Sequence, residues 1–132
     1  MHAVLFGSEQ GEYLAMRFEQ PEPEKQGWIE AEITVAVEAF RGSIEIIFEY
    51  VDIAEFERQL RRVYDTLNGR AVFKHRDGQL MFSVEGNGRG GIALSGYAYA
   101  RPTWGNKLEF EIAFDQTYLL QPLAVLQTLA QQ

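Results

Sequence analysis

The sequence predicts an α+β fold, a curved antiparallel β-meander sheet with two helices packed on one face. Several segments alternate apolar and polar residues, as strands do, and two stretches carry apolar residues at helical spacing. The strands follow one another in runs, which favours antiparallel pairing over alternating parallel units. Each helix has one apolar stripe, so both helices need the sheet to cover them.

Alternation predicts the strands, and turn residues separate them. In the clearest strand, residues 28–39, five apolar side chains share one face: Ile29, Ala31, Ile33, Val35 and Val37. Further strands are expected at 3–7, 12–18, 43–51, 70–75, 79–85, 91–100 and 107–114. Arg41-Gly42 is a predicted turn. The segment 19–27 is expected to leave the sheet because Pro21 and Pro23 cannot donate ladder hydrogen bonds.

Two helices are predicted from their apolar stripes and end signals. The first is expected to open at Asp52, whose carboxylate can accept hydrogen bonds from free backbone N–H groups. Asn68-Gly69 is expected to end it. Its stripe consists of Ile53, Phe56, Leu60, Val63 and Leu67. The second helix follows Asp115 and reaches about residue 130, with Pro122 in its first turn.

The chain is predicted to be a single domain spanning residues 1–132. Its length is typical of one domain, its composition is 46% hydrophobic, and no linker interrupts it. The two halves of the sequence follow the same order of elements. In each half an alternating strand ends in an aspartate, Asp52 or Asp115, and a Leu-rich helix follows. A duplication would explain this, and so would the general pattern of strand, cap and helix, which is the interpretation we prefer.

Composition and charge exclude several kinds of chemistry and disfavour some kinds of partner. The absence of Cys excludes disulfides, thiolate chemistry and Cys-ligated zinc. A formal net charge of −7 disfavours a nucleic-acid partner, because phosphate neutralisation needs a basic surface. The N-terminus does not resemble a signal peptide and no apolar run is long enough for a membrane helix, so we expect a cytoplasmic protein without a membrane partner.

No residue set predicts catalysis, a cofactor or a metal, so we expect a protein that is not an enzyme. Segment 86–91 matches G-x-G-x-x-G formally, but the alternating residues after it predict a hairpin turn. His75 is interpreted as a surface residue without an orienting partner. A carboxylate pair of the kind used in glycoside hydrolysis remains the weaker enzyme alternative.

The sharper functional signal is an acidic strand face. Eight glutamates are expected to point outward from the sheet: Glu30, Glu32, Glu38, Glu45, Glu49, Glu85, Glu109 and Glu111. No Lys or Arg is expected among them, and Lys74 on the 70–75 strand is the nearest exception. Trp28, Tyr97 and Tyr99 share the parity of these glutamates. Acidic groups interleaved with aromatics suit a protein interface, although solvated strand faces also carry Glu. The predicted partner-binding residues are Trp28, Glu30, Glu32, Glu45, Glu49, Tyr97, Tyr99, Glu109 and Glu111.

From about Trp28 to Leu129 the chain resembles the WapI-type immunity proteins. The resemblance is carried by six segments: Gly27-Trp28-Ile29, Phe40-Arg41-Gly42-Ser43, Phe56-x-x-x-Leu60, Gly91-Ile92-Ala93-Leu94-Ser95-Gly96, Asn106-Lys107-Leu108-x-Phe110 and Phe114-Asp115-Gln116-Thr117-Tyr118-Leu119. It implies a cytoplasmic inhibitor that binds a cognate toxin domain, often a nuclease acting on RNA. Such domains are often basic, which would suit the glutamates.

The alternative function is a binding module for a small apolar or carbohydrate ligand, held by a curved sheet. Trp28, Trp104, Tyr97 and Tyr99 are the aromatics that would stack on such a ligand. None of these patterns predicts an oligomeric state.

Overall fold

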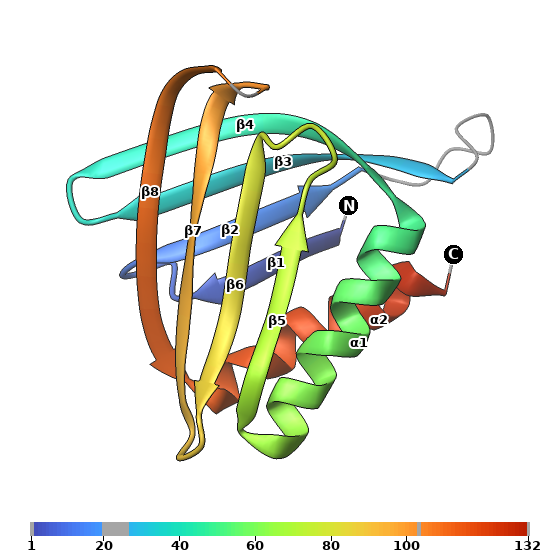
Figure 1. The fold of residues 1–132 in the computed structure, drawn as a ribbon, viewed down its shortest axis with the longest axis vertical. Coiled ribbons are helices and arrows are strands. Elements are labelled where there is room, and N and C mark those ends of the chain that lie inside the picture. The colour runs from blue at the N-terminus through green and yellow to red at the C-terminus, as the bar shows by residue number, and fades with distance from the viewer. Residues whose placement is uncertain (1, 20–26, 103, 132) are drawn as a thin grey trace.

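A computed structural model of the chain describes residues 2–19, 27–102 and 104–131. These residues form two four-stranded antiparallel sheets and two α-helices (Figure 1). The first sheet has the order β1 (His2–Gly7), β2 (Tyr13–Phe18), β3 (Trp28–Val37) and β4 (Phe40–Glu49), and α1 (Tyr50–Thr66) follows it. The second sheet has the order β5 (Asn68–Lys74), β6 (Leu80–Asn87), β7 (Gly91–Arg101) and β8 (Trp104–Asp115), followed by the 3-10 turn η1 (Gln116–Leu119) and α2 (Leu120–Ala130).

The α+β class with antiparallel meanders and two helices is confirmed, and the strands divide between two sheets. The division falls at α1, which carries the chain away from the edge of β4, so that β5 starts a new sheet. In Figure 1 the strands of β5–β8 cross in front of β1–β4. The order of four strands and a helix thus occurs twice. Residues 20–26, with Pro21 and Pro23 of the predicted loop, and Thr103 lie outside the described residues.

Each helix packs against the first strand of a sheet and closes its edge. α1 contacts β5 and β6, α2 contacts β1, and the helices contact each other. The backbone N–H of Val72 donates to Oε1 of Gln59 in α1 at 2.9 Å. The Gln121 amide in α2 accepts from Leu5 N at 2.8 Å and donates to the Ala3 carbonyl at 2.7 Å. These amides satisfy backbone groups that an open edge would offer to another chain.

Aromatic side chains join the two sheets. Phe82 on β6 is fully buried, and its ring centroid lies 5.7 Å from Phe6 on β1, 5.4 Å from Phe56 on α1 and 5.5 Å from Phe73 on β5. Of the five predicted inward residues of β3, four are buried and Val37 is partly buried; the four are Ile29, Ala31, Ile33 and Val35. One hydrophobic cluster therefore contains residues of both halves.

The predicted cap at Asp52 is wrong. Helix α1 begins at Tyr50 with Glu49 in the N-cap position, and no side chain caps it. Asp52 therefore lies inside the first turn, and the Glu49 carboxylate accepts a hydrogen bond from Arg76 at 2.5 Å. At the other end the helix stops at Leu67, whose φ of 64° is left-handed, and β5 already starts at Asn68.

The predicted turn at Arg41-Gly42 is also wrong. The strands β3 and β4 remain paired as far as Val37 and Phe40, so the turn consists of Glu38 and Ala39. Glu38 has a positive φ of 46°, which a two-residue hairpin turn requires at its first position when the turn is of the primed kind. The polar Glu at this position did not reveal the turn, since Gly or Asn is the usual signal.

The predicted cap at Asp115 is confirmed. Its Oδ1 accepts from the Thr117 backbone N–H at 2.8 Å and from the Thr117 hydroxyl. These hydrogen bonds favour the ionised carboxylate and hold the pKa of Asp115 below its ordinary value of 3.8. Asp115 therefore stabilises the start of η1 only while it is charged.

The Asp115→Ala variant is expected to have a lower urea midpoint than the wild type at pH 6. Because the folded pKa is lowered, the contribution is present above the unfolded pKa and is lost as pH falls through the folded value. The difference between the two midpoints should therefore shrink between pH 4 and about pH 2. Urea titrations across this range measure it, with Asp65→Ala, an exposed change in α1, as the control. A difference independent of pH would contradict the charged cap.

Candidate partner-binding surfaces

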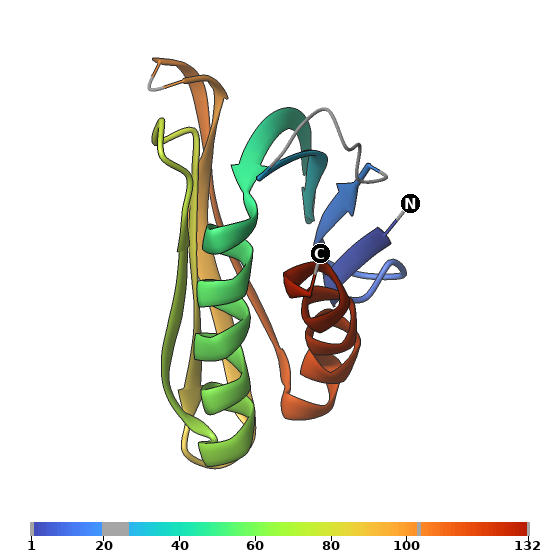
Figure 2. The same ribbon diagram turned by 90° about the vertical axis from the view of Figure 1, so that its right-hand side faces the viewer.

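The predicted binding residues lie on the outer faces of two different sheets. Four glutamates and Trp28 belong to β3 and β4: Glu30, Glu32, Glu45 and Glu49. The other four residues belong to β7 and β8: Tyr97, Tyr99, Glu109 and Glu111. Figure 2 shows the two sheets as separate layers, with β5–β8 at the left and β1–β4 at the right. The chain therefore has two candidate surfaces in place of one acidic face.

The expectation that no Lys or Arg lies among the outward glutamates is wrong. Among the described residues, ion pairs join Arg17 with Glu32 at 3.6 Å, Arg70 with Glu85 at 2.9 Å, Arg76 with Glu49 at 2.5 Å and Lys107 with Glu109 at 3.1 Å. Three of these cations come from a different strand or turn than the glutamate they contact. Parity within one strand could not reveal them, because strand pairing decides which charges meet.

The first surface is built around Trp28 at the start of β3. Trp28 pairs with Glu49, and Glu30 pairs with Ile47, so Trp28 and Ile47 are diagonal neighbours on the outer face. Both are large apolar side chains and both are exposed, at 41% and 48%. We call this surface the Trp28 patch; it comprises Trp28, Glu30, Glu45, Ile47, Glu49 and Arg76. A hollow of about 380 Å³ opens beside it and is also lined by Asp52 and Asp77.

Arg76 bridges the aromatic and acidic parts of the Trp28 patch. Its guanidinium carbon lies 5.6 Å from the centroid of the Trp28 ring, and its Nη2 lies 2.5 Å from Oε1 of Glu49. A cation in this position interacts with the ring face and with the carboxylate together. The patch thus already accommodates a guanidinium group between Trp28 and Glu49.

His75 holds the turn that carries Arg76, and its predicted surface position is wrong. The side chain is 9% exposed and its ring lies 5.7 Å from Phe48. Its Nε2 donates to the Ile47 carbonyl of β4 at 3.0 Å. The turn between β5 and β6 is therefore fastened to the edge of β4. This role could not be predicted from the sequence, because no local signal places residue 75 against residue 47.

The acidic side chains of this face also repel one another. Glu32 and Glu45 are directly opposed in the β3–β4 ladder, where like charges cost stability. Beside the Glu49–Arg76 pair, the carboxylates of Glu45, Asp52 and Asp77 line one hollow. The local field is therefore negative, and an added cation would relieve the repulsion.

The second surface has a different charge balance. The rings of Tyr97 and Tyr99 lie 5.5 Å apart, and Nζ of Lys107 lies 4.8 Å from the first centroid and 5.4 Å from the second. Lys107 also donates to Glu109, and this hydrogen bond raises the pKa of Lys107. The cation covers both tyrosines, so this surface lacks the exposed aromatic anchor of the Trp28 patch.

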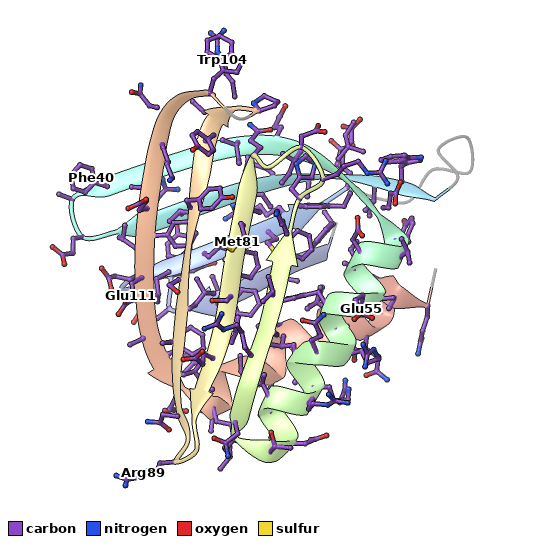
Figure 3. All side chains as sticks on the ribbon, viewed as in Figure 1. Phe40, Glu55, Met81, Arg89, Trp104 and Glu111 are labelled. Carbon is purple, nitrogen blue, oxygen red and sulfur yellow. The ribbon has the colours of Figure 1, made fainter. Side chains whose placement is uncertain are left out.

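A cleft of about 440 Å³ opens where the two sheets diverge. Its apolar walls come from both sheets: Ile33, Val35, Ile44, Ala98 and Leu108. Of the four aromatics expected to stack on a small ligand, Tyr99 alone lines the cleft. Trp28 lies on the outer face of the first sheet, and Trp104 lies at the β7–β8 hairpin (Figure 3). These aromatics do not form one ligand site.

Two further properties hold for the described residues. No three His, Cys, Asp or Glu side chains among them are grouped so that they could hold a metal ion. None of the helices they form combines the length and the apolar character needed to cross a membrane.

The fold is similar to a solved structure of low sequence identity. The chain superposes on a chain described as "Crystal structures of trypanosoma bruciei MRP1/MRP2" with a TM-score of 0.52 and 13% identity, covering 98% of this chain and 80% of that one. At this identity the similarity concerns the fold alone. No curated protein matches the chain.

The family comparison agrees with the motifs noted in the sequence. Residues 5–132 match the family described as "Immunity protein WapI-like family". The match includes β2 to β8 and both helices, and thus both candidate surfaces. The chain therefore belongs to the WapI-like immunity protein family.

Proposed function

We propose that this protein is a non-enzymatic inhibitor that binds a cognate, basic toxin domain through the Trp28 patch, and that it does so in the cytoplasm. Membership of an immunity protein family supports the binding of a toxin. The choice of surface rests on Trp28 and Ile47, an exposed apolar pair enclosed by carboxylates. Tyr97, Tyr99, Glu109 and Glu111 belong to the other sheet and are not part of this proposed site.

The chemistry of the patch suits a basic protein partner. Aromatic residues near the centre of an interface carry much of its binding energy, while surrounding charges steer the encounter. Arg76 already occupies the place between the Trp28 ring and the Glu49 carboxylate, so a partner's Arg or Lys would bind beside it, at the carboxylates of Glu45, Asp52 and Asp77. The same carboxylates would repel nucleic-acid phosphates, so the proposed partner is the toxin protein and not its substrate.

Reversing two charges of the Trp28 patch is expected to slow association with the toxin domain by about 10- to 100-fold at low salt. The variant is Glu30→Lys with Glu45→Lys. The second change also replaces one of two opposed glutamates, Glu32 and Glu45, so the sheet should remain folded. The measurement is stopped-flow or surface-based kinetics with the toxin domain encoded beside the gene, at two salt concentrations.

The matched control reverses Glu109 and Glu111 on the second sheet. Both double variants change the formal net charge from −7 to −3, because each reversal adds two charges. If the Trp28 patch docks the toxin, the control should slow association less than about threefold. Equal slowing in both variants would show that only total charge matters. An unchanged rate in the patch variant would overturn the proposed site.

A second candidate function is binding of a small apolar ligand in the cleft between the sheets, which its apolar walls favour. A fluorescent apolar probe such as anilinonaphthalene sulfonate should then bind with one site per chain. Leu108→Arg, a change in the cleft wall, should abolish this binding while inhibition of the toxin persists. If probe binding does not saturate at one site, the cleft is not a ligand site.

A further inference from the structure

The outer face of the β5–β8 sheet is uncovered. In Figure 2 this sheet forms the left side of the molecule, and α1 lies on its other side. Within the described residues, no helix or strand packs over the outward side (Figures 1 and 2). Its outward residues form three rows across the strands. Read from β5 to β8, the rows are Arg70, Glu85, Ala93 and Ala113; then Val72, Ser83, Ser95 and Glu111; then Lys74, Met81, Tyr97 and Glu109.

We call this surface, together with Lys107, the open sheet face. Apart from Glu85, which pairs with Arg70 of β5, its middle strands carry no charged outward side chains, and Ser83, Ala93 and Ser95 are small enough for another sheet to approach to the usual separation of about 10 Å. Met81 and Tyr97 are neighbours near its centre, and Val72 is an exposed apolar residue on β5. Figure 3 shows Met81 over the middle of the sheet and Glu111 beside β8.

The open sheet face is neutral in a strongly acidic protein. It carries three cations and three carboxylates, so its formal charge is zero while the chain carries −7. The charges are also arranged in order. Two cations, Arg70 and Lys74, lie on β5; β6 carries Glu85, and β8 carries the two carboxylates Glu109 and Glu111 together with Lys107. Within the described part of the chain, neither Lys74 nor Glu111 makes an ion pair.

This order fits a second copy of the same surface in one orientation. A two-fold axis parallel to the strands places β5 of one copy over β8 of the other. Each row of one copy then lies over the same row of the other copy, in the reverse order. Lys74 then faces Glu109 of the other copy and shares this carboxylate with that copy's Lys107. Met81 faces Tyr97, whose ring face Lys107 covers, so the sulfur would contact the ring edge. An axis across the strands would instead place β5 over β5, so that Lys74 faces Arg70, and the like charges would repel.

We propose that two copies of this chain pair face to face through their open sheet faces, with β5 of each copy over β8 of the other. The contact is isologous, so it closes as a dimer and does not extend into a fibre. Four strands spaced about 4.8 Å apart, each contributing about eight residues of 3.3 Å, give a flat area of roughly 500 Å². This is smaller than a standard stable interface of about 800 Å² per partner, so the dimer dissociates in the micromolar range.

Sedimentation equilibrium of the full chain between about 1 and 500 µM, a range around the expected micromolar dissociation constant, tests the proposal. The wild type should show a monomer–dimer equilibrium. Lys74→Glu and Glu109→Lys should each weaken the dimer at least tenfold, and the double variant should restore it to within about threefold, because it exchanges the two facing charges. Glu45→Lys, which makes the same charge change on the other sheet, should leave the equilibrium unchanged.

A steric variant gives an independent measurement. Ser95 lies in the middle row on β7, where an arginine would point to solvent in the monomer and into the partner in the dimer. Ser95→Arg should therefore leave a monomer at every concentration with an unchanged urea midpoint. A wild type that stays monomeric, a dimer that tolerates Ser95→Arg, or a charge exchange that fails to restore pairing would each overturn the proposal. So would a Ser95→Arg variant that loses only toxin binding, since the toxin would then occupy this face.

Discussion

Replacing Phe82 with alanine is expected to lower the free energy of unfolding by about 3–5 kcal/mol. Phe82 is fully buried, and its ring contacts Phe6 of the first sheet, Phe56 of α1 and Phe73 of the second sheet. Truncation would leave a cavity at the point where these three elements meet. The surrounding rings are fixed by their own contacts, so they cannot collapse to fill it.

Phe40→Ala provides the matched control for this change. Phe40 is 67% exposed at the end of the β3–β4 hairpin, and the same truncation there should cost about 0.5 kcal/mol or less (Figure 3). Urea denaturation followed by far-ultraviolet circular dichroism and by tryptophan fluorescence measures both variants. Trp28 reports on the first sheet and Trp104 on the second.

The same titrations test the proposal that residues 1–132 form one domain. Since the Phe82 ring joins both sheets, the unfolding transition seen by circular dichroism and the one seen by tryptophan fluorescence should shift together in Phe82→Ala. Two separate transitions, of which only the second sheet's moves, would contradict a shared core and with it the single domain.

Much of the secondary structure follows from local rules. The alternation at Ile29, Ala31 and Ile33 defines an inward face whatever strand lies beside it, and these residues are buried. The stripe of α1 is similarly local, and Phe56 and Leu60 are buried as predicted. Such patterns depend on the period of the element alone.

The division into two sheets does not follow from local rules. It depends on where β5 pairs after α1, and a long-range contact such as that between Phe82 and Phe6 decides it. The start of α1 shows the same limit. Asp52 has the right local signal for a cap, yet the helix begins earlier, at Tyr50, and the N-cap residue Glu49 binds Arg76, a residue of a later turn.

The family motif around residues 91–96 has a structural explanation. Gly96 lies opposite Phe82 in the β6–β7 ladder, and a Cβ at residue 96 would overlap the Met81 carbonyl oxygen and the Phe82 backbone. Glycine is needed there for the close approach of the two strands. A motif of this kind identifies the fold, which is why it could not indicate the binding surface.

The residues of the proposed binding surface were predicted only in part. Trp28, Glu30, Glu45 and Glu49 were identified by parity and do lie together. Ile47 was missed because it departs from the acidic pattern of its neighbours, and Arg76 was missed because a turn places it there. Glu109 and Glu111 share the parity of the first group, but they belong to another sheet.

Trp28→Ala is expected to speed dissociation of the toxin domain by at least about 30-fold, which corresponds to about 2 kcal/mol. The ring is exposed in the free protein, stands beside Ile47 and has Arg76 on one face. On binding, a partner would bury both apolar side chains, and truncation would remove that contact. The association rate should change little, because the carboxylates that steer the encounter remain.

Trp104→Ala is the control for Trp28→Ala, because it removes the same kind of side chain at a different place on the surface. Trp104 is 59% exposed, and Arg101 lies 4.7 Å from its ring centroid, so it too combines an exposed indole with an arginine. It belongs to the β7–β8 hairpin, away from the Trp28 patch. Its removal should leave both rate constants for the toxin unchanged, measured by the same surface-based kinetics. If Trp104→Ala speeds dissociation and Trp28→Ala does not, the toxin docks at the β7–β8 hairpin and the Trp28 patch is not its binding site.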